Sequence, residues 1–289
     1  MTRVVAIGGG HGLAMTLRAV RRYAGHVTAV VATSDDGGSS GRLRRELDLP
    51  APGDLRRCLS AIAGDDVIAA GFEHRFSAGD LEGHALGNLV LAGLVDAGHD
   101  LAAAARLAST WLGIDPDRAT VLPATCAPVT LIGVSAGGEI HGQVAVEATE
   151  SVRSIRFAPP DPDVPHDAVR AITDADQIVL GPGSFLTSVL AAASVPGIAK
   201  AIEGAAGRVV LVANLDADVA DHVEIARNHG LRVDQVITQT PAESPAGGGA
   251  PAIGDVRVVV ADVDRPHGLA HDADLLAQVL ASLASNPTK

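Results

Sequence analysis

Most of the side chains that could do chemistry lie in one stretch of ten residues. It runs from Thr33 to Arg42 and holds two adjacent aspartates, three glycines, four hydroxyl side chains and an arginine. Adjacent carboxylates repel each other unless water, a metal ion or donor groups surround them, and glycines let backbone N–H groups approach a ligand closely. The candidate ligand-binding residues here are Asp35, Asp36, Gly37, Gly38, Ser39, Ser40 and Arg42.

The element that must position this stretch is the apolar run at 27–32, which is typical of a buried strand. Open α/β sheets bind ligands beyond the carboxyl ends of their parallel strands, so we expect a ligand-binding loop there. A solvated turn is the alternative, because Asp, Gly and Ser are ordinary turn residues. The length of the stretch favours the loop, since a tight turn needs only a few residues.

Two further glycine-rich stretches also follow apolar runs. The first comes after 3–7 and opens a helix; the second comes after 176–180. A glycine turn before a helix places free N–H groups and the positive helix end where a phosphate would lie. The alternatives are a tight turn without a ligand and a helix cap at Ser184. The candidates are Gly9, Gly10, His11 and Gly12 in the first stretch, and Gly181, Gly183, Ser184 and Thr187 in the second. Because all three stretches follow strands, all should open on one edge of the sheet.

Four polar residues between these stretches are also candidates. Asp54 follows a proline-rich turn and reads as the N-cap of a helix at 55–63, a role that accounts for it without a ligand. His84 and Asn88 stand between glycines before an apolar helix, where they could reach a pocket or serve as a supporting histidine and an N-cap. Asn214 ends a strand at 208–212. The segment 42–57 carries five arginines against three acids, an excess that suits phosphate recognition.

The alternation of strands and helices predicts an α/β fold, a Rossmann-like three-layer α/β/α structure with a mostly parallel sheet, in a single nucleotide-binding domain over 1–289. Short apolar runs at 119–122, 129–134, 139–143 and 152–157 predict a small antiparallel excursion or an edge of the sheet, with a β-rich subdomain around 119–158. The helix at 101–112 carries the only tryptophan, which we place in the core. The Pro- and Gly-rich stretch 239–252 is expected to be mobile or exposed.

Composition excludes several classes. Lys and Arg number 22 against 34 Asp and Glu, a net charge of −12, and aromatics make up 2% of the residues. Nucleic-acid binders need a basic field and stacking surfaces, so no nucleic-acid partner is expected. Cys58 and Cys126 are the only two cysteines, and we expect both to be reduced thiols. No membrane-spanning run and no signal peptide stand out, so a cytoplasmic location is expected.

Five motifs together resemble the YvcK-type gluconeogenesis factor family (UPF0052), which is similar in fold to the 2-phospho-L-lactate transferase (CofD) family. They lie at 7–12, 35–44, 52–56, 83–89 and 181–189. The resemblance implies a Rossmann-like cytoplasmic protein that binds UDP-N-acetylglucosamine and is linked to carbon metabolism, cell shape and peptidoglycan precursor supply. It also suggests a homo-oligomer. The transferase relatives use Mg²⁺, and their chemistry would assign the cation to Asp35 and Asp36 and the diphosphate to the cation and Arg42.

The chain departs from that family at several positions. His11 replaces a usual threonine, Arg57 a common asparagine, Ala85 a usual serine and Ala270 a common arginine. The loop between Asn214 and His222 lacks the usual Gly-Tyr-Thr segment, and a tyrosine of the later loop is absent. These departures leave the diphosphate pocket in place and put the sugar specificity in question.

Three functions follow from these observations. The first is a regulator that binds a small phosphorylated ligand, a nucleotide sugar or a dinucleotide, without turnover, since no nucleophile–base pair is evident. The second is a Mg²⁺-dependent phospholactyl-type transferase. The third is an NAD(P)-dependent oxidoreductase, which the glycine spacing disfavours because it does not match the GxGxxG pattern.

Overall fold

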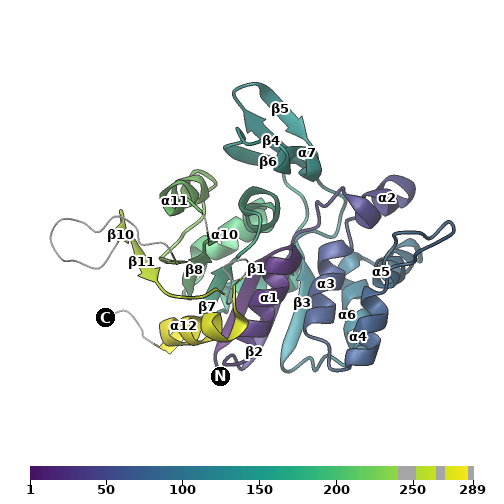
Figure 1. The fold of residues 1–289 in the computed structure, drawn as a ribbon, viewed down its shortest axis with the longest axis horizontal. Coiled ribbons are helices and arrows are strands. Elements are labelled where there is room, and N and C mark those ends of the chain that lie inside the picture. The colour runs from purple at the N-terminus through teal and green to yellow at the C-terminus, as the bar shows by residue number, and fades with distance from the viewer. Residues whose placement is uncertain (216, 240–251, 265–270, 286–289) are drawn as a thin grey trace.

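The computed structural model describes residues 1–215, 217–239, 252–264 and 271–285. Its centre is an eight-stranded sheet of order β10-β11-β9-β8-β7-β1-β2-β3, parallel except for β10 against β11 (Figure 1). The strands are β1 (Arg3–Gly8), β2 (His26–Val31), β3 (Ala119–Pro123), β7 (Gln177–Leu180), β8 (Arg208–Val212), β9 (Gln235–Thr238), β10 (Ala252–Ile253) and β11 (Val256–Val260). The predicted α/β fold with a mostly parallel sheet is confirmed.

Helices cover both faces of this sheet, which is why its strands are apolar on both sides. In β1, Val4 and Ala6 pack into one core cluster, while Val5 and Ile7 pack into the other. The first layer contains α1 (Gly10–Val20), α3 (Gly53–Ala61), α4 (Asp66–Glu73), α5 (Leu86–Asp96), α6 (Leu101–Trp111) and α12 (Ala273–Ser285). The second contains α8 (His166–Thr173), η1 (Phe185–Leu190), α9 (Ala191–Ala193), α10 (Pro196–Gly204) and α11 (Val219–Asn228).

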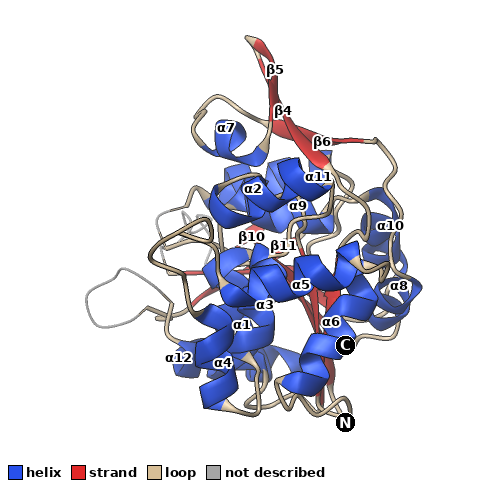
Figure 2. Ribbon diagram, turned by 90° about the vertical axis from the view of Figure 1, so that its right-hand side faces the viewer, coloured by secondary structure: helices blue, strands red, loops and turns tan. Residues whose placement is uncertain are grey.

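A three-stranded antiparallel sheet stands apart from the main sheet. It consists of β4 (Thr130–Ser135), β5 (Gly138–His141) and β6 (Ser154–Ala158), with α7 (Gln143–Glu147) between β5 and β6. Figure 2 shows it projecting beyond the body of the molecule, above α2 (Gly38–Leu47). We call β4, β5, β6 and α7 the antiparallel unit. Our grouping of 119–122 with this excursion was wrong, because β3 pairs in parallel with β2.

The order of the strands places β1 between β2 and β7. The chain builds β2 and β3 on one side of β1, then returns to build β7, β8 and β9 on the other. Such a reversal opens a crevice beyond the carboxyl ends of the two central strands. The expectation that three glycine-rich loops share one edge is confirmed, since they follow the neighbouring parallel strands β1, β2 and β7.

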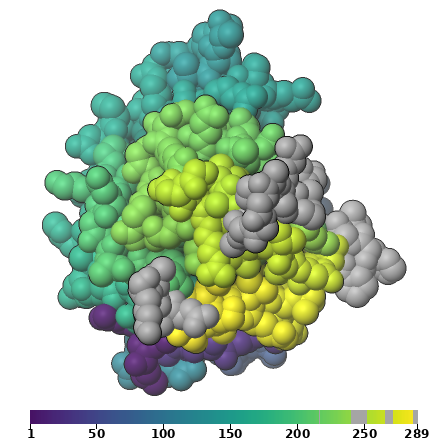
Figure 3. All heavy atoms as spheres, turned by 90° about the vertical axis from the view of Figure 1, so that its left-hand side faces the viewer, coloured from purple at the N-terminus to yellow at the C-terminus, as the bar shows by residue number. Residues whose placement is uncertain are grey.

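Some local expectations differ from the structure. Trp111 is 50% exposed instead of lying in the core; it is the last residue of α6 and is not among the residues that the helix buries. Both cysteines are free. Most of the stretch expected to be mobile, 240–251, lies outside the described residues. Figure 3 shows the side of the molecule to which the carboxyl-terminal segments contribute, among them β11 and α12.

No single helix in the described part of the chain has the length and apolar character needed to cross a membrane. One bent pair of helical segments, Phe185–Ala193 and Pro196–Gly204, together has the length and apolar composition of a membrane span, and only these two properties support it. Most of its apolar side chains belong to the core beneath the sheet.

Candidate functional site

The amino termini of three helices meet at the carboxyl edge of the sheet. Asp54, in the first turn of α3, lies so close to the start of α1 that a Cβ added at Gly9 would be 2.4 Å from its Oδ2. Ser40, in the first turn of α2, lies against Gly53, where an added Cβ would be 2.3 Å from the Ser40 Oγ. The first N–H groups of a helix have no partner within the helix and carry a positive partial charge. Three such ends together favour an anionic ligand.

The loop after β7 lies beside these three helix ends. It borders the crevice between β1 and β7, which we call the switch point. A Cβ at Gly12 would lie 2.1 Å from the Pro182 carbonyl oxygen, so Gly12 is required by the approach of the two loops. The Thr16 hydroxyl donates to the Gly181 carbonyl at 2.8 Å, while Gly181 itself has a φ of +78°. Gly10, by contrast, has a φ of +63° and open space beside it. The side of Gly10 where a side chain would lie is therefore open, while its N–H donates to Asp54.

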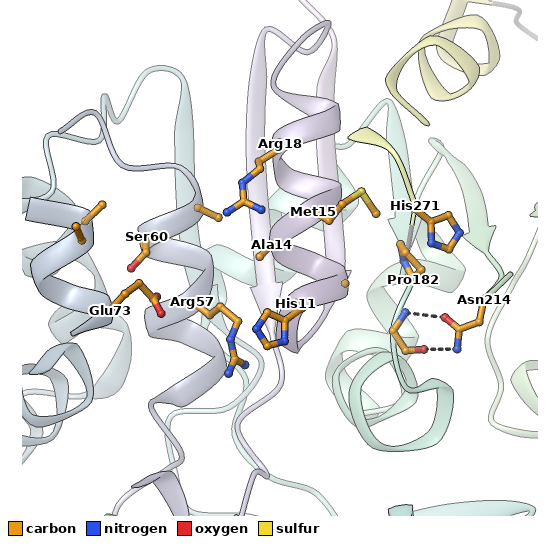
Figure 4. A pocket seen from close by; sticks show the side chains of 15 residues that line it. His11, Ala14, Met15, Arg18, Arg57, Ser60, Glu73, Pro182, Asn214 and His271 are labelled. Carbon is orange, nitrogen blue, oxygen red and sulfur yellow. Dashed lines mark hydrogen bonds between the residues drawn. The ribbon is translucent and has the colours of Figure 1, made fainter. Parts of the chain in front are cut away.

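Asn214 fixes the same loop from β8. Its Nδ2 donates to the Gly183 carbonyl at 3.0 Å, and its Oδ1 accepts from the Gly183 N–H at 3.2 Å. Both polar atoms of the amide are thus used within the protein (Figure 4). Asn214 positions the loop and lines the cleft described below.

Asp35 and Asp54 form the carboxylate pair of this site. Asp35 Oδ1 accepts from the Gly37 N–H at 2.9 Å, and its Oδ2 lies 3.3 Å from a Cβ added at Gly53. Asp54 is 7% exposed. The pKa of Asp54 is raised to about 6, chiefly by burial; Arg57 and the Gly10 N–H act to lower it, and the charge of Asp35 acts to raise it. Our interpretation of Asp54 as an N-cap was wrong, because α3 begins one residue earlier, at Gly53, with Pro52 as its N-cap.

Asp36 contacts the antiparallel unit. Its Oδ1 accepts from the Val144 N–H at 3.0 Å, in the first turn of α7, and its Oδ2 would lie 2.2 Å from a Cβ at Gly142. Asp36 therefore joins the loop after β2 to this unit, while the charge of Asp35 acts on Asp54. The Asp35–Asp36 metal pair stays a prediction.

Arg42 contacts the loop before α5, where its guanidinium donates to the Glu82 carbonyl at 2.5 Å. The contact of Arg42 with a diphosphate stays a prediction. Gly37 precedes α2 as its N-cap, and Gly38 has a φ of +46° with open space beside it.

Ser39, His84 and Asn88 form a buried network behind α2. The Ser39 hydroxyl lies 3.0 Å from His84 Nδ1 and accepts from Asn88 Nδ2 at 2.9 Å. Burial, then the charge of Arg42, lowers the pKa of His84. This serine–histidine contact was missed from the sequence, but the network joins α2 to α5 and lies away from the Asp35–Asp54 pair. Asn88 is not an N-cap, since Ala85 holds that position in α5.

Ser184 and Thr187 lie beside a different cavity. Thr187 Oγ1 donates to Ser184 Oγ at 2.6 Å, and Ser184 caps no N–H of η1 with its side chain. Both residues line a cavity of about 350 Å³ between η1, α11 and the antiparallel unit. The rings of Phe185 and His222 stack in its wall, with centroids 4.0 Å apart. These two hydroxyls are thus separated from the cleft at α1.

A cleft of about 570 Å³ runs along the outer face of α1 from the switch point. At one end it meets His11, Gly12 and the loop of Pro182 and Gly183; at its sides it meets α3 and α4, and His271 (Figure 4). Sequence reasoning missed most of its lining, in particular Met15, Arg18, Ser60, Glu73 and His271. The available signal was the spacing of His11, Ala14, Met15 and Arg18, which fall on one face of a helix.

Basic groups gather around this cleft although the chain is acidic. Arg57 donates to Asp54 Oδ1 at 2.8 Å, and buried Arg56 donates to Glu73 Oε2 at 2.5 Å. The charge of Arg57 is the main reason why the pKa of His11 is lowered, followed by burial. In Figure 4, His11 and Arg57 lie side by side at the amino end of α1. A phosphate placed there would contact both and relieve their mutual repulsion.

The site also fits a Mg²⁺ ion in its chemistry. Mg²⁺ takes oxygen ligands and is commonly held by one or two carboxylates together with phosphates of the substrate. Asp35 and Asp54 supply two carboxylates, and burial keeps the pKa of Asp54 raised although Arg57 lies beside it. Within the described residues no cluster of three or more His, Cys, Asp or Glu could hold a metal ion. A cation here would therefore depend on a ligand for further oxygens.

Comparisons with known proteins agree with the motifs. The sequence profile of 2-phospho-L-lactate transferase CofD matches residues 4–247. A Mycobacterium tuberculosis protein with the provisional name gluconeogenesis factor is 40% identical over 96% of this chain and 89% of its own length. The gluconeogenesis factor of Bacillus subtilis is 35% identical over 78% of this chain and 74% of its own.

A solved structure supports the same assignment. A member of the UPF0052 family from Bacillus halodurans superposes with a TM-score of 0.86 and 31% identity, covering 96% of this chain and 98% of that protein. The resemblance drawn from the motifs is thus confirmed. The chain belongs to the CofD family and, within it, to the gluconeogenesis factors, which makes it a carbon-metabolism factor related to 2-phospho-L-lactate transferase.

Proposed function

We propose that this chain is a cytoplasmic regulatory protein that binds a nucleotide sugar of the UDP-N-acetylglucosamine type without turning it over. In this proposal the bound ligand reports on carbon metabolism and on the supply of peptidoglycan precursors, and so influences cell shape. The diphosphate lies at the amino termini of α1, α2 and α3, and one end of the ligand lies in the cleft along α1.

The observation that carries the proposal is the coincidence of the cleft with the switch point between β1 and β7. The helix ends there offer several N–H groups to an anion, and Gly10 leaves the backbone open. His11 and Arg57 add side-chain donors beside those ends. A cleft of about 570 Å³ is of the size that holds a small-molecule ligand.

Support for binding without turnover comes from the polar groups themselves. The serine–histidine contact of Ser39 and His84 is buried, and neither residue lines the cleft. The hydroxyls of Ser184 and Thr187 bond each other beside another cavity. Among the described residues that line the cleft, none forms a nucleophile–base pair.

The test is calorimetric titration of the full chain with UDP-N-acetylglucosamine, with and without MgCl₂. We expect saturable binding that Arg57→Gln weakens by about tenfold, because a charge-assisted contact to phosphate is lost. The matched control is Arg45→Gln, which removes an exposed arginine on α2 outside the cleft. No heat with several nucleotide sugars, or equal affinity for the Arg57 variant and the wild type, would contradict the proposal.

A second candidate function is a Mg²⁺-dependent transferase of the phospholactyl type. The Asp35–Asp54 pair favours it, because a non-catalytic diphosphate site has no need of two carboxylates beside the phosphates. A Mg²⁺ ion bound there would neutralise the diphosphate and so activate a nucleotide leaving group. Asp35 and Asp54 would hold the ion, while the helix ends and Arg57 would orient the donor.

The decisive assay for this candidate incubates the chain with a nucleoside-diphospholactate donor, a deazaflavin acceptor and MgCl₂. Release of nucleoside monophosphate that stops in EDTA and in Asp54→Asn would establish the transferase. Binding of the donor without product, at protein concentrations above that of the donor, would favour the regulator.

A further inference from the structure

One side chain in the cleft remains unaccounted for by the phosphate site. Arg18 follows His11 by seven residues on the same face of α1, and both line the cleft. Seven residues of helix span about 10 Å, and long helical side chains lean back toward the amino end. Figure 4 shows the Arg18 side chain above Ala14, where it extends from α1 toward α3 on one side of the cleft. Its guanidinium therefore lies within reach of a ligand that starts at the helix end.

The charges around Arg18 leave it without compensation. Arg57 pairs with Asp54, Arg56 pairs with Glu73, and Arg22 on the next turn pairs with Asp274. Arg18 makes no hydrogen bond or ion pair with any residue in the described ranges. In a chain of net charge −12, an uncompensated guanidinium inside a concave site is a position for an anion.

The walls next to Arg18 leave space for such a group. The cleft is lined there by small side chains of three helices, Ala14, Ala61, Ala69 and Ala70. Ser60 also lines the cleft, but its hydroxyl is buried. An oxygen-rich group bound at Arg18 would therefore find a guanidinium fork among small apolar side chains.

We propose that Arg18 is a specificity-determining residue that binds a second anionic group of the ligand, a phosphate monoester or a carboxylate, beyond the diphosphate. The inference rests on the proposed function for the position of the diphosphate. Among the nucleotide ligands of the proposed function, it predicts that one with an additional negative charge binds more tightly than neutral-sugar ligands such as UDP-N-acetylglucosamine. A planar guanidinium binds both groups through two parallel N–H donors, which a neutral hydroxyl cannot match.

The experiment compares ligands that differ by one anionic group. UDP-glucuronate and UDP-glucose differ by a carboxylate on the sugar, and NADP⁺ and NAD⁺ differ by a phosphate on the ribose. Each is titrated calorimetrically into the wild-type chain at low salt with MgCl₂. We expect the acidic member of one pair to bind about tenfold more tightly than the neutral member, and the pair that shows this preference identifies the end of the ligand that faces Arg18.

Three variants separate the role of Arg18 from general charge. Arg18→Gln should remove the preference and leave the affinity for the neutral member within about twofold. Arg18→Lys, which keeps the charge and loses the fork, should keep part of it. Arg21→Gln is the matched control, because it removes one exposed arginine from the end of the same helix outside the cleft and should keep the full preference. Thermal unfolding of each variant checks the fold.

Two results would overturn the inference, and they differ from each other. If wild type binds both members of each pair equally, or if Arg18→Gln keeps the wild-type preference, Arg18 does not select the ligand, while the proposed diphosphate site stands. If wild type binds none of the four ligands, nor UDP-N-acetylglucosamine, the proposed function fails and the inference fails with it.

Discussion

At the scale of the residue, the buried carboxylate of Asp54 lowers the free energy of unfolding when it is ionised. Its carboxylate is almost fully buried, and its pKa rises from 3.8 to about 6. The ionised form is therefore disfavoured in the folded state, although Arg57 lies beside it. Such a residue is kept for function and not for stability, since a neutral side chain of the same shape would fold more readily.

The first prediction concerns Asp54→Asn and the pH. Because the folded pKa of Asp54 lies above its unfolded value, protonation stabilises the fold fully below about pH 4, and this contribution is lost as the pH rises through about 6. At pH 7.5 the asparagine variant should gain up to about 2 kcal/mol in free energy of unfolding. The gain should vanish below about pH 4. Urea unfolding at both pH values measures it.

A lower free energy of unfolding for Asp54→Asn at pH 7.5 would contradict this sign. It would mean that the ion pair with Arg57 outweighs the cost of burying the carboxylate. The matched control is Asp66→Asn in α4, which removes an exposed carboxylate and should show no such pH-dependent gain.

At the scale of the element, glycines inside helices have opposite roles in α1 and α4. Gly12 permits the contact with the β7 loop, where a Cβ would lie 2.1 Å from the Pro182 carbonyl oxygen. Gly71 has nothing within 4 Å of the corresponding position. The same substitution therefore tests packing in one helix and propensity in the other.

We expect Gly12→Ala to lower the free energy of unfolding by about 2 kcal/mol or more, because backbone atoms of the β7 loop must move. Gly71→Ala should raise it by about 0.5–1 kcal/mol, because alanine favours the helix and meets no neighbour. Chemical unfolding of both variants decides. A neutral Gly12→Ala would show that the two loops are separable, and the switch-point site would lose its main structural support.

The antiparallel unit provides a second prediction at this scale. Asp36 accepts from the Val144 N–H, and Arg44 donates to the carbonyls of Ser34 and Val129, both at 2.8 Å. These contacts tie the loop after β2 to that unit. Asp36→Ala should speed amide exchange in 142–147 by about tenfold and leave exchange in the main sheet unchanged. Asp36→Asn, which keeps an acceptor oxygen, should resemble the wild type. Uniform acceleration across the chain would instead indicate a global role for Asp36.

At the scale of the whole molecule, the site places carboxylates, a proposed diphosphate and an acidic chain together. Phosphates and the ionised Asp35–Asp54 pair repel each other, and the helix ends offset only part of that repulsion. A cation between them would remove it. Binding of ligand and of Mg²⁺ should therefore be coupled, each strengthening the other.

The corresponding prediction is thermal. UDP-N-acetylglucosamine and MgCl₂ together should raise the unfolding temperature more than the sum of their separate effects. Ligand at 100 times its dissociation constant contributes about 2.7 kcal/mol. In Asp54→Asn the synergy should be lost, whereas ligand alone should still stabilise. Additive shifts in the wild type would show that the carboxylate pair does not hold the cation.

The sequence by itself determined the elements and the edge of the sheet at which the site lies. The apolar runs at 3–7, 27–32 and 176–180 form β1, β2 and β7. Short apolar runs bounded by glycine loops are typical of parallel strands that are buried on both faces. The motifs also determined the family. These features are local, and local patterns are what a sequence displays directly.

Only the tertiary structure decided which polar side chains meet. Asp35 and Asp36 are neighbours in the chain, yet Asp35 Oδ2 lies beside Gly53 of α3 and Asp36 accepts from the Val144 N–H of α7. Likewise Arg42 donates to the Glu82 carbonyl, while Arg18 and Arg57, from two helices, reach one cleft. The physical reason is that side-chain direction depends on the backbone at each residue and on how the helices pack, and both are fixed only when distant segments meet.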